Sequence, residues 1–298
     1  MSFSMELKNE LCHVDINCPE QACYELLGIT LFSRCFENNS FTIMSENEFF
    51  IKHINNLLDF LNIIDNTDSS YNQKKYRKKI RYFIDIKDSK TIKRLNNILN
   101  DNNLTDNLQL KFLSDFIRGI FLACGNISNP SSNYHLEFVI YNLNLLNIIL
   151  YALNSIKSCD INPSVTVRRN TNIVYIKESE NIVDLLTYMG ATKSSMNFIQ
   201  TKMVHEFRNY INRTTNFETA NISKTTKAAA EQVKAINKIK NTVGLDSLPN
   251  SLKEIAKLRL ANPYMSLSEL SGCLSKPLSR SGINHRLSKI VDISQKLK

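Results

Sequence analysis

Near the end of the 298-residue chain, the stretch SGINHRLSK (residues 281–289) places hydrogen-bonding side chains beside an apolar row. Ile283, Leu287 and Ile290 are spaced four and three residues apart, which puts them on one face of a helix. Asn284 falls on the opposite arc. An asparagine side chain can bond an adenine edge twice, and an arginine can do the same with guanine. The spacing predicts a helix that is buried on one side and can contact bases on the other.

Two further helices are predicted before this one, over residues 251–261 and 266–274, and residues 275–280 form the turn that follows them. Each helix opens with a serine and, three residues later, a glutamate, which is the spacing of a capping box: Ser251 with Glu254, and Ser266 with Glu269. The third helix is predicted from about Ser281 to Ile290. Two short capped helices, a turn and a basic helix indicate a helix-turn-helix unit. A three-helix bundle without a nucleic-acid role is the alternative.

In a helix-turn-helix unit the last helix lies in the major groove, with its N-terminal residues at the base edges. Arg286 lies towards the flank of the helix, where contact with the DNA backbone is expected. A catalytic role for His285 is disfavoured, because the neighbouring sequence offers no nucleophile and no orienting carboxylate. The expected DNA-binding residues are Arg280, Ser281, Asn284, His285, Arg286, Ser288 and Lys289, with backbone contacts from Arg213, Asn216, Lys224 and Lys276.

The positive charge of the chain is concentrated in its last third. Residues 201–298 hold 17 Lys and Arg against seven Asp and Glu, whereas residues 1–200 hold 20 against 21. This segregation predicts a module that binds a polyanion, joined to a nearly neutral body. A basic surface kept for solubility is the alternative.

The first 190 residues contain an internal repeat. LLGITLFSR (26–34) and IRGIFLACG (117–125) each place one glycine, Gly28 or Gly119, inside an otherwise bulky helix. Glycine destabilises a helix interior by roughly 1 kcal/mol relative to alanine. Its recurrence at the same point predicts that two helices approach each other closely there.

Similar elements follow each glycine helix. The first is followed by a strand (40–46), a helix (49–64) and an extended basic stretch (74–86). The second is followed by a strand (135–142), a helix (143–156), a hairpin (165–176) and a closing helix (181–191) with a stop signal at Gly190. The fold class is α+β, a pseudo-two-fold α/β domain followed by an all-α helix-turn-helix domain. The expected domains are a helical lead-in (1–20), the α/β domain (21–205, with repeats at about 21–105 and 109–200), a turn-rich connector (206–225, densest in Asn, Thr and Arg over 212–225) and the helix-turn-helix domain (226–298).

The two glycine helices resemble degenerate copies of the motif that names the LAGLIDADG homing endonucleases. In that family an acidic residue at the end of each helix holds a divalent metal ion for phosphodiester cleavage. The resemblance places this acid at Ser33 and Cys124, and the other aspartate of the motif at Leu31 and Leu122. Mg²⁺ prefers carboxylate and water oxygens, so we expect no metal, no cofactor and no cleavage. Arg34 replaces the final glycine of the first copy, which makes that half the more degenerate one.

The resemblance also implies that the sheets of the α/β domain face DNA. The candidate contacts are Lys78, Arg81, Arg168 and Arg169, where basic residues are interleaved with tyrosine. The alternative is a solvated hairpin tip whose lysines protect a sheet edge from pairing with another chain.

The seven cysteines are an odd number at irregular spacing, which indicates reduced thiols in a cytoplasmic protein. Cys12, His13, Cys18 and Cys23 could be interpreted as a zinc site, but the short Cys-x-x-Cys pairs of structural zinc sites are absent. No apolar run approaches the roughly 18 residues of a membrane span, and the N-terminus does not resemble a secretion signal. A membrane partner is therefore not expected.

The whole chain resembles the WhiA family of bacterial sporulation and cell-division regulators. The matching stretches include SFSMELKNEL, RGIFLACGNISNP, NRTTNFETANISKT and LPNSLKEIAKLRLANPYMSLSEL with SKPLSRSGINHRL. The resemblance implies sequence-selective binding of double-stranded DNA, transcription control, a role in cell division and chromosome segregation, and a nucleoid location. RNA polymerase or a sigma factor is an implied partner. Two alternatives stay open: a nucleoid-bound adaptor whose first domain binds a protein partner, and a metal-dependent endonuclease.

Overall fold

A computed structural model describes residues 2–33, 35–37, 40–64, 71–76, 79–100 and 110–297 of the chain. The chain divides into two compact units, Met1–His205 and Glu206–Lys298. The predicted positions Arg34 and Lys78 lie outside the described residues. No helix in the described ranges combines the length and the apolar character that a membrane crossing requires.

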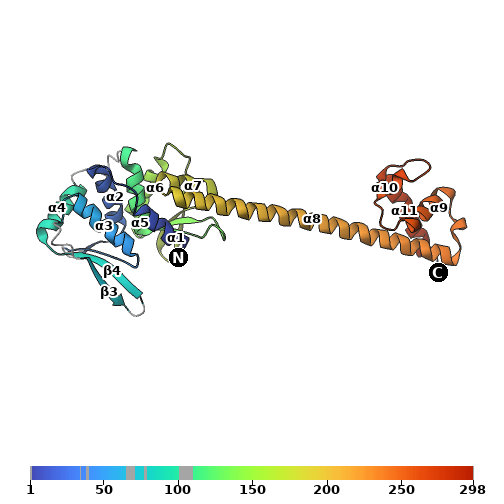
Figure 1. Ribbon diagram of the computed structural model, residues 1–298, viewed down its shortest axis with the longest axis horizontal. Coiled ribbons are helices and arrows are strands. Elements are labelled where there is room, and N and C mark those ends of the chain that lie inside the picture. The colour runs from blue at the N-terminus through green and yellow to red at the C-terminus, as the bar shows by residue number, and fades with distance from the viewer. Residues whose placement is uncertain are drawn as a thin grey trace. The chain divides into compact units, whose positions relative to one another are not determined.

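The first unit repeats one arrangement twice. Within the described residues it holds two antiparallel sheets of four strands, in the orders β1-β2-β4-β3 and β5-β6-β8-β7. Because the two orders correspond strand for strand, the predicted pseudo-two-fold α+β fold is confirmed. The first repeat comprises α2 (Pro19–Phe32), β1 (Phe36–Glu37), β2 (Ser40–Ser45), α3 (Glu48–Phe60), β3 (Tyr71–Tyr76), β4 (Lys79–Ile86) and α4 (Ser89–Asn100). The second comprises η1 (Leu110–Phe112), α5 (Leu113–Cys124), β5 (Gly125–Ile127), β6 (Leu136–Ile140), α6 (Leu143–Asn154), β7 (Ser164–Arg168), β8 (Thr171–Ile176) and α7 (Ser179–Tyr188) (Figure 1).

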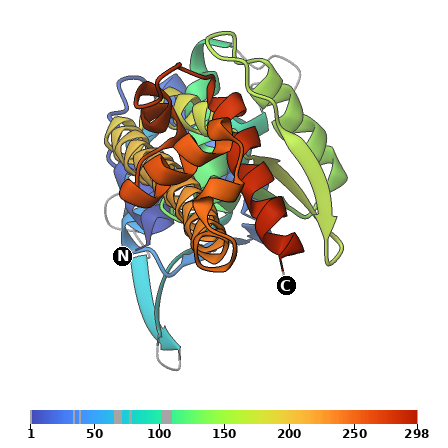
Figure 2. The same cartoon turned by 90° about the vertical axis from the view of Figure 1, so that its right-hand side faces the viewer.

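Alternation along the strands places one face of each sheet in the core. In β2, Phe41 and Ile43 are buried, and they pair across the strand with Ile86 and Ile84 of β4. In β6 the buried side chains likewise alternate with half-buried ones. A strand directs successive side chains to opposite faces, so this pattern covers one sheet face with helices and leaves the other face available. The β3–β4 hairpin extends away from the helices of its unit (Figure 2).

The N-terminal helix α1 (Phe3–Leu11) packs against α3 of the first repeat and against α5 and β5 of the second, and it lies beside the start of α8 (Thr192–Thr242). Its apolar residues Phe3, Leu7 and Leu11 recur every four residues and are buried. Beyond them, the Glu10 carboxylate accepts hydrogen bonds from the backbone N–H groups of Lys193 (2.7 Å) and Ser194 (2.8 Å). These groups lie at the start of α8, where N–H groups lack helical partners, so Glu10 caps that helix.

The predicted turn-rich connector is wrong as secondary structure. Residues 206–225 belong to α8, one continuous helix from Thr192 to Thr242. Two of the Thr side chains that suggested turns are accommodated by bonding back along the helix: Thr214 donates to the carbonyl oxygen of Tyr210, and Thr225 donates to that of Asn221. This i−4 bonding is a known way for threonine to persist inside a helix.

The second unit contains η2 (Leu245–Ser247), α9 (Asn250–Ala261), α10 (Leu267–Gly272) and α11 (Arg280–Lys296), which gather around the last turns of α8 (Figure 2). The predicted capping box of α10 is confirmed, with Ser266 and Glu269 bonded reciprocally. The one predicted for α9 is wrong, because that helix starts one residue earlier, after Pro249, with no side-chain cap. Glu254 instead accepts a hydrogen bond from the backbone N–H of Ser275, 2.8 Å away.

Candidate nucleic-acid interface

The apolar row of α11 is fully inside the second unit. Ile283, Leu287 and Ile290 are each 0% exposed. They pack with apolar residues of α8, α9, α10 and the turn after α10: Ile236, Ile239, Leu252, Ile255, Ala256, Leu270 and Leu274. Burial of a full side chain of this size contributes about 1.5–3 kcal/mol, so this row fixes the rotation of α11 about its axis. That rotation decides which side chains α11 presents outward.

The turn between α10 and α11 is held by side-chain to backbone hydrogen bonds. The Ser271 hydroxyl donates to the carbonyl oxygen of Leu278. The Ser279 side chain is the N-cap of α11 and accepts from the N–H of Gly282 at 3.1 Å. Together with the bond between Glu254 and Ser275, these contacts anchor the turn at both ends. The start of α11 is therefore held in a fixed position. A side chain that contacts a base edge requires such a position.

The side chains predicted to contact bases lie outside the apolar row of α11 and are exposed. Arg280, Ser281, Asn284 and His285 are exposed, and so are Ser288 and Lys289 one turn later. Arg286 differs from them, because it is half-buried and its Nη1 donates to the carbonyl oxygen of Ser251 at 3.2 Å. It joins α11 to the start of α9. Arg286 therefore has a structural contact that its position in the sequence did not indicate.

The predicted backbone contacts lie on two elements. Arg213, Asn216 and Lys224 are exposed on α8, and Lys276 is exposed in the turn before α11. At about 100° per residue, the three α8 side chains fall within an arc of roughly 80°. They share one side of that helix, which is an arrangement that could follow a phosphate backbone.

A cavity of about 960 Å³ lies beside the N-terminus of α11. Its wall includes Ala229 and Val233 of α8, the loop residue Tyr264, and Arg280 and Asn284 of α11. Tyr264 is 93% exposed at its rim. Two of the predicted base-contacting side chains thus flank a hollow. No pattern in the sequence predicts this cavity, because its wall comes from three separate segments.

Arg259 positions the loop between α9 and α10. This arginine is only 2% exposed, and its Nη1 donates to the carbonyl oxygens of Met265 (2.7 Å) and Pro263 (3.3 Å). Burial lowers the pKa of its guanidinium. Because Met265 directly precedes the Ser266 cap of α10, Arg259 fixes where that helix begins. The sequence does not indicate that Arg259 is buried, because this arginine is one basic residue among many in its segment.

The first unit contains the joint that the glycine repeat predicted. A Cβ atom added to Gly28 would lie 2.4 Å from the carbonyl oxygen of Phe116, and one added to Gly119 would lie 2.2 Å from that of Glu25. Real Cβ atoms do not approach backbone oxygens so closely. Helices α2 and α5 therefore touch backbone to backbone, and the predicted close approach is confirmed.

Ser33 and Cys124, the positions at which the motif resemblance places the acidic residue, have other contacts. The Ser33 hydroxyl donates to the carbonyl oxygen of Ile29 at 2.5 Å, within its own helix end. Burial raises the pKa of the Cys124 thiol to about 12. Lys8 of α1 reaches the same end of α5, where its ammonium donates to the carbonyl oxygen of Leu122 at 3.0 Å and burial lowers its pKa. A lysine ammonium, a hydroxyl and a neutral thiol offer no ligand set that suits Mg²⁺.

No group of three or more His, Cys, Asp or Glu side chains in the described part of the chain could hold a metal ion. The described residues include Cys12, His13, Cys18 and Cys23, which the zinc interpretation invoked. All seven cysteines are free thiols.

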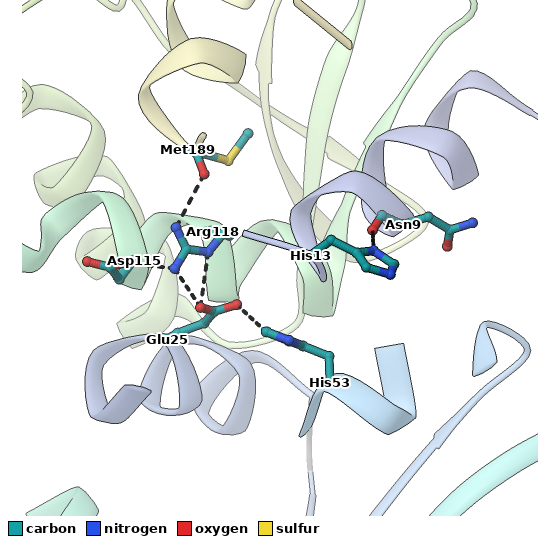
Figure 3. A network of polar contacts seen from close by, with 7 residues as sticks. All are labelled: Asn9, His13, Glu25, His53, Asp115, Arg118 and Met189. Carbon is teal, nitrogen blue, oxygen red and sulfur yellow. Dashed lines mark hydrogen bonds and ion pairs between the residues drawn. The ribbon is translucent and has the colours of Figure 1, made fainter. Parts of the chain in front are cut away.

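A buried ion network crosses the joint, and no pattern in the sequence indicates it (Figure 3). Glu25 of α2 accepts hydrogen bonds from Arg118 of α5 (Nη2, 2.7 Å; Nε, 3.0 Å) and from His53 of α3 (2.7 Å). Arg118 Nη2 also donates to Asp115 at 2.7 Å, and Nη1 to the carbonyl oxygen of Met189 at 3.4 Å. The network therefore connects both repeats and the end of α7.

The electrostatics of this network keep Glu25 ionised. Burial by itself would raise the pKa of Glu25, but the hydrogen bonds and charges of His53 and Arg118 outweigh it and hold the pKa below its usual value. Asp115 has the opposite shift, because burial outweighs its contact with Arg118 and raises its pKa. Each charged side chain of the network is bonded to another member of it. The network therefore stabilises the joint and leaves none of these groups free for catalysis.

The candidate contacts on the sheets are less regular. Arg81 of β4 is half-buried, and its Nη1 contacts the Met44 sulfur at 3.8 Å. Arg168 and Arg169 are exposed at the β7–β8 turn. Arg169 and Asn170 have φ angles of 49° and 61°, which form a tight hairpin turn. The turn holds both arginines outward, at the end of the sheet.

These features define a class of protein: a LAGLIDADG-like α/β body without the acidic metal ligands, joined to a helix-turn-helix unit. Two family models match the chain. The WhiA LAGLIDADG-like domain matches residues 2–81 and 113–208, and the WhiA C-terminal HTH domain matches residues 211–294. The chain belongs to the WhiA family.

Relatives of known name agree with this assignment over the whole length. The chain is similar to a probable cell division protein WhiA of Thermoanaerobacter pseudethanolicus, with 37% identity over 100% of this chain and 98% of the relative. It is 35% identical to the protein of the same name from Clostridium botulinum, over 100% and 99% of the two chains. The crystal structure of full-length DUF199/WhiA from Thermotoga maritima covers 100% of this chain and 99% of its own, with 26% identity and a TM-score of 0.58.

Proposed function

We propose that the protein is a sequence-selective DNA-binding regulator that does not cut DNA. The observation that carries the proposal is the division of α11 into a buried apolar row and an exposed polar arc that begins at Arg280. The excess of positive charge in residues 201–298 supports it, because neutralised phosphates supply much of the affinity of DNA-binding proteins. In this function Asn284 and Arg280 contact base edges, and the lysines of the turn and of α8 contact phosphates.

The test compares binding to a selected site with binding to unrelated DNA of the same length. The Arg280→Ala and Asn284→Ala variants should each weaken selective binding by about 1–3 kcal/mol and change non-selective binding much less. Lys296→Ala is the matched control, because Lys296 is exposed on the last turn of the same helix. If footprinting of the wild-type chain shows uniform, salt-sensitive protection, the adaptor alternative is favoured instead.

The absence of cleavage is part of the proposal. Ser33 and Cys124 supply no carboxylate, and the ion pairs of the joint are used internally. A nicking assay on supercoiled plasmid with Mg²⁺ should show no product above background. Turnover that is removed by EDTA would support the endonuclease alternative.

The role in cell division is supported by the names that the relatives carry. We infer that the protein acts in the cytoplasm at chromosomal or promoter sites and takes part in transcription control, cell division and chromosome segregation, with a sporulation role in spore-forming hosts. RNA polymerase or a sigma factor is the proposed protein partner. Sequencing of the DNA that co-purifies with the chain from its host tests the first part. Recovery of random chromosomal fragments would contradict it.

A further inference from the structure

The cavity beside the N-terminus of α11 has the size and the wall of a small-molecule site. Its volume of about 960 Å³ falls within the range of roughly 300–1,000 Å³ that ligand pockets occupy. Every residue of its wall belongs to the second unit, so the cavity is formed by that unit alone. Apolar side chains supply much of the wall, among them Ile222 and Val233 of α8 and Leu267 of α10. Such a wall favours a ligand with an apolar body.

Two buried polar atoms of the wall residues have no hydrogen-bond partner among the residues that the structure describes. They are Oε1 of Gln232, a side chain that is 8% exposed, and Nε of Arg259. The bonds from Arg259 Nη1 to Met265 and Pro263 hold the guanidinium in place but leave Nε without an acceptor. Folded proteins pair nearly all their buried polar atoms, because an unpaired one destabilises the fold. A ligand with one acceptor and one donor would complete both atoms.

The charges of the wall favour a negative ligand. Lys234, Arg259 and Arg280 are cationic wall residues. Glu269 is an acidic one, but its carboxylate already accepts from the backbone N–H of Ser266 at 2.7 Å, within the capping box of α10. The cations outnumber the acid, so the local potential attracts an anion.

Tyr264 favours an aromatic ring in that ligand. This tyrosine belongs to the wall and is 93% exposed, so its ring is available to another ring. Aromatic rings pack on one another in offset or edge-to-face arrangements, which bury apolar area on both sides.

We propose that this cavity binds a small aromatic anion that also carries an N–H or O–H donor. The anionic group accepts a hydrogen bond from Nε of Arg259, and the donor bonds Oε1 of Gln232. The aromatic body lies against Tyr264 and the apolar side chains of the wall. The site itself does not depend on the DNA-binding function.

A ligand in this cavity lies beside two side chains that the proposed function assigns to base edges. Arg280 and Asn284 both belong to the wall. Ligand and DNA therefore compete for these side chains, and each weakens the binding of the other by the same factor. This competition rests on the proposed function, whereas the existence of the site does not.

Fluorescence titration of the full chain with toluidinonaphthalene sulfonate tests the site. This probe has an aromatic body, a sulfonate that accepts hydrogen bonds and an amine N–H that donates one. The wild type should bind it below about 1 mM and should bind the uncharged analogue phenylnaphthylamine less tightly. A wild type that does not bind the sulfonate up to about 1 mM, or that binds both probes equally, would overturn the proposal.

A substitution that fills the cavity locates the probe. Ala229→Trp places an indole in the wall and should abolish probe binding, with the helix content unchanged by circular dichroism. Ala220→Trp is the matched control and should bind the probe as the wild type does. Ala220 is exposed, outside the wall and, at about 100° per residue, on the opposite side of the same helix. Unchanged binding to Ala229→Trp would show that the probe binds elsewhere, which would overturn the site.

A second variant tests the unpaired acceptor. Gln232→Leu should weaken probe binding by about 3- to 10-fold, the effect of one hydrogen bond. Its melting temperature should stay the same or rise, because a buried unpaired atom is removed. Gln295→Leu, at an exposed position of α11 outside the wall, is the matched control and should leave probe binding unchanged. Equal binding by Gln232→Leu and the wild type would overturn the assigned hydrogen bond.

The competition is measured by adding the probe to the chain bound to its selected DNA site. The affinity of the wild type for DNA should fall as the probe is added, and that of Ala229→Trp should not respond. A probe that binds the cavity and leaves the DNA affinity unchanged would overturn the competition. A chain without selective DNA binding would contradict the proposed function, and the titration without DNA would still decide whether the site exists.

Discussion

At the α2–α5 joint of the first unit, Glu25, Asp115 and Arg118 are at most 3% exposed and are bonded to one another. On α11 of the second unit, Arg280 and Lys289 are exposed. A buried charge must find its partner inside the protein, whereas an exposed one keeps its donors for a ligand. The contrast indicates that the joint is a structural device, and it supports the proposal that the surface of α11 carries recognition.

The same contrast separates two kinds of helix contact. The α2–α5 joint depends on glycines that allow backbones to touch, and a methyl group at either position would collide with backbone atoms. The α11 contact depends on interlocking aliphatic side chains. Substitutions at the joint should therefore affect folding, and substitutions on the outer arc of α11 should affect binding. The following predictions test this division, from the largest expected effect to the smallest.

Removal of the central cation should break the joint. Arg118→Met leaves Glu25 and Asp115 buried without their shared counter-charge, and the expected loss is about 3–5 kcal/mol. Hydrogen exchange of peptides from α2 and α5 in the full chain measures this loss. Lys93→Met, on the exposed face of α4, is the control and should change stability by less than about 0.5 kcal/mol. An Arg118→Met chain with native protection at the joint would show that the network contributes no stability.

A methyl group at the glycine contact should separate the helices. Gly119→Ala forces the Glu25 carbonyl oxygen to move and should destabilise the first unit by about 3 kcal/mol, despite the better helix propensity of alanine. Gly272→Ala is the matched control, because nothing lies within 4 Å of its added Cβ. That variant should be neutral or gain up to about 1 kcal/mol. Equal effects in thermal unfolding would refute the close contact.

The joint should also confer a dependence on pH. Because the pKa of Glu25 is lower in the folded chain than in the unfolded chain, its contribution to stability is present above about pH 4.3 and is lost as the pH falls through the folded value. The raised pKa of Asp115 acts in the opposite sense, since its contribution declines as the pH rises. Glu25→Gln should be less stable at pH 7 and should lose less stability in acid. Urea unfolding, monitored by circular dichroism at several pH values, measures both the stability at pH 7 and the loss of stability in acid.

The reactivity of the cysteine thiols should differ according to their burial, and no change in the stability of the chain is expected. Burial raises the pKa values of Cys12, Cys35 and Cys124 to about 12, so few thiolates exist at neutral pH. Cys273 is exposed after α10. Mass spectrometry after brief treatment with iodoacetamide should find Cys273 modified first and Cys124 among the last. Rapid modification of Cys124 would show that the joint opens.

The repeat, the fold class and the helix order of the second unit could be predicted from the sequence. Periodicity predicted the buried row of α11, and the paired glycines predicted the close approach of α2 and α5, because both signals lie within short segments. The predicted secondary structure of residues 206–225 is wrong, because Asn and Thr suggested turns where the structure has a helix. The cap predicted for α9 is also wrong, because Ser251 is the second residue of that helix and Pro249 is its N-cap.

What the sequence determined by itself is therefore local: which residues repeat, which helix face is apolar, and that the acidic ligands of the motif are missing. What the tertiary structure decided is the pairing of distant groups. Glu25 and Arg118 are 93 residues apart in the chain, and only the contact of α2 with α5 brings them together. The burial of Arg259, the contact of Lys8 with Leu122 and the cavity beside Arg280 likewise come from segments that meet in space. Short-range patterns record the hydrophobic period of an element, whereas the partner of a buried charge depends on how whole elements pack.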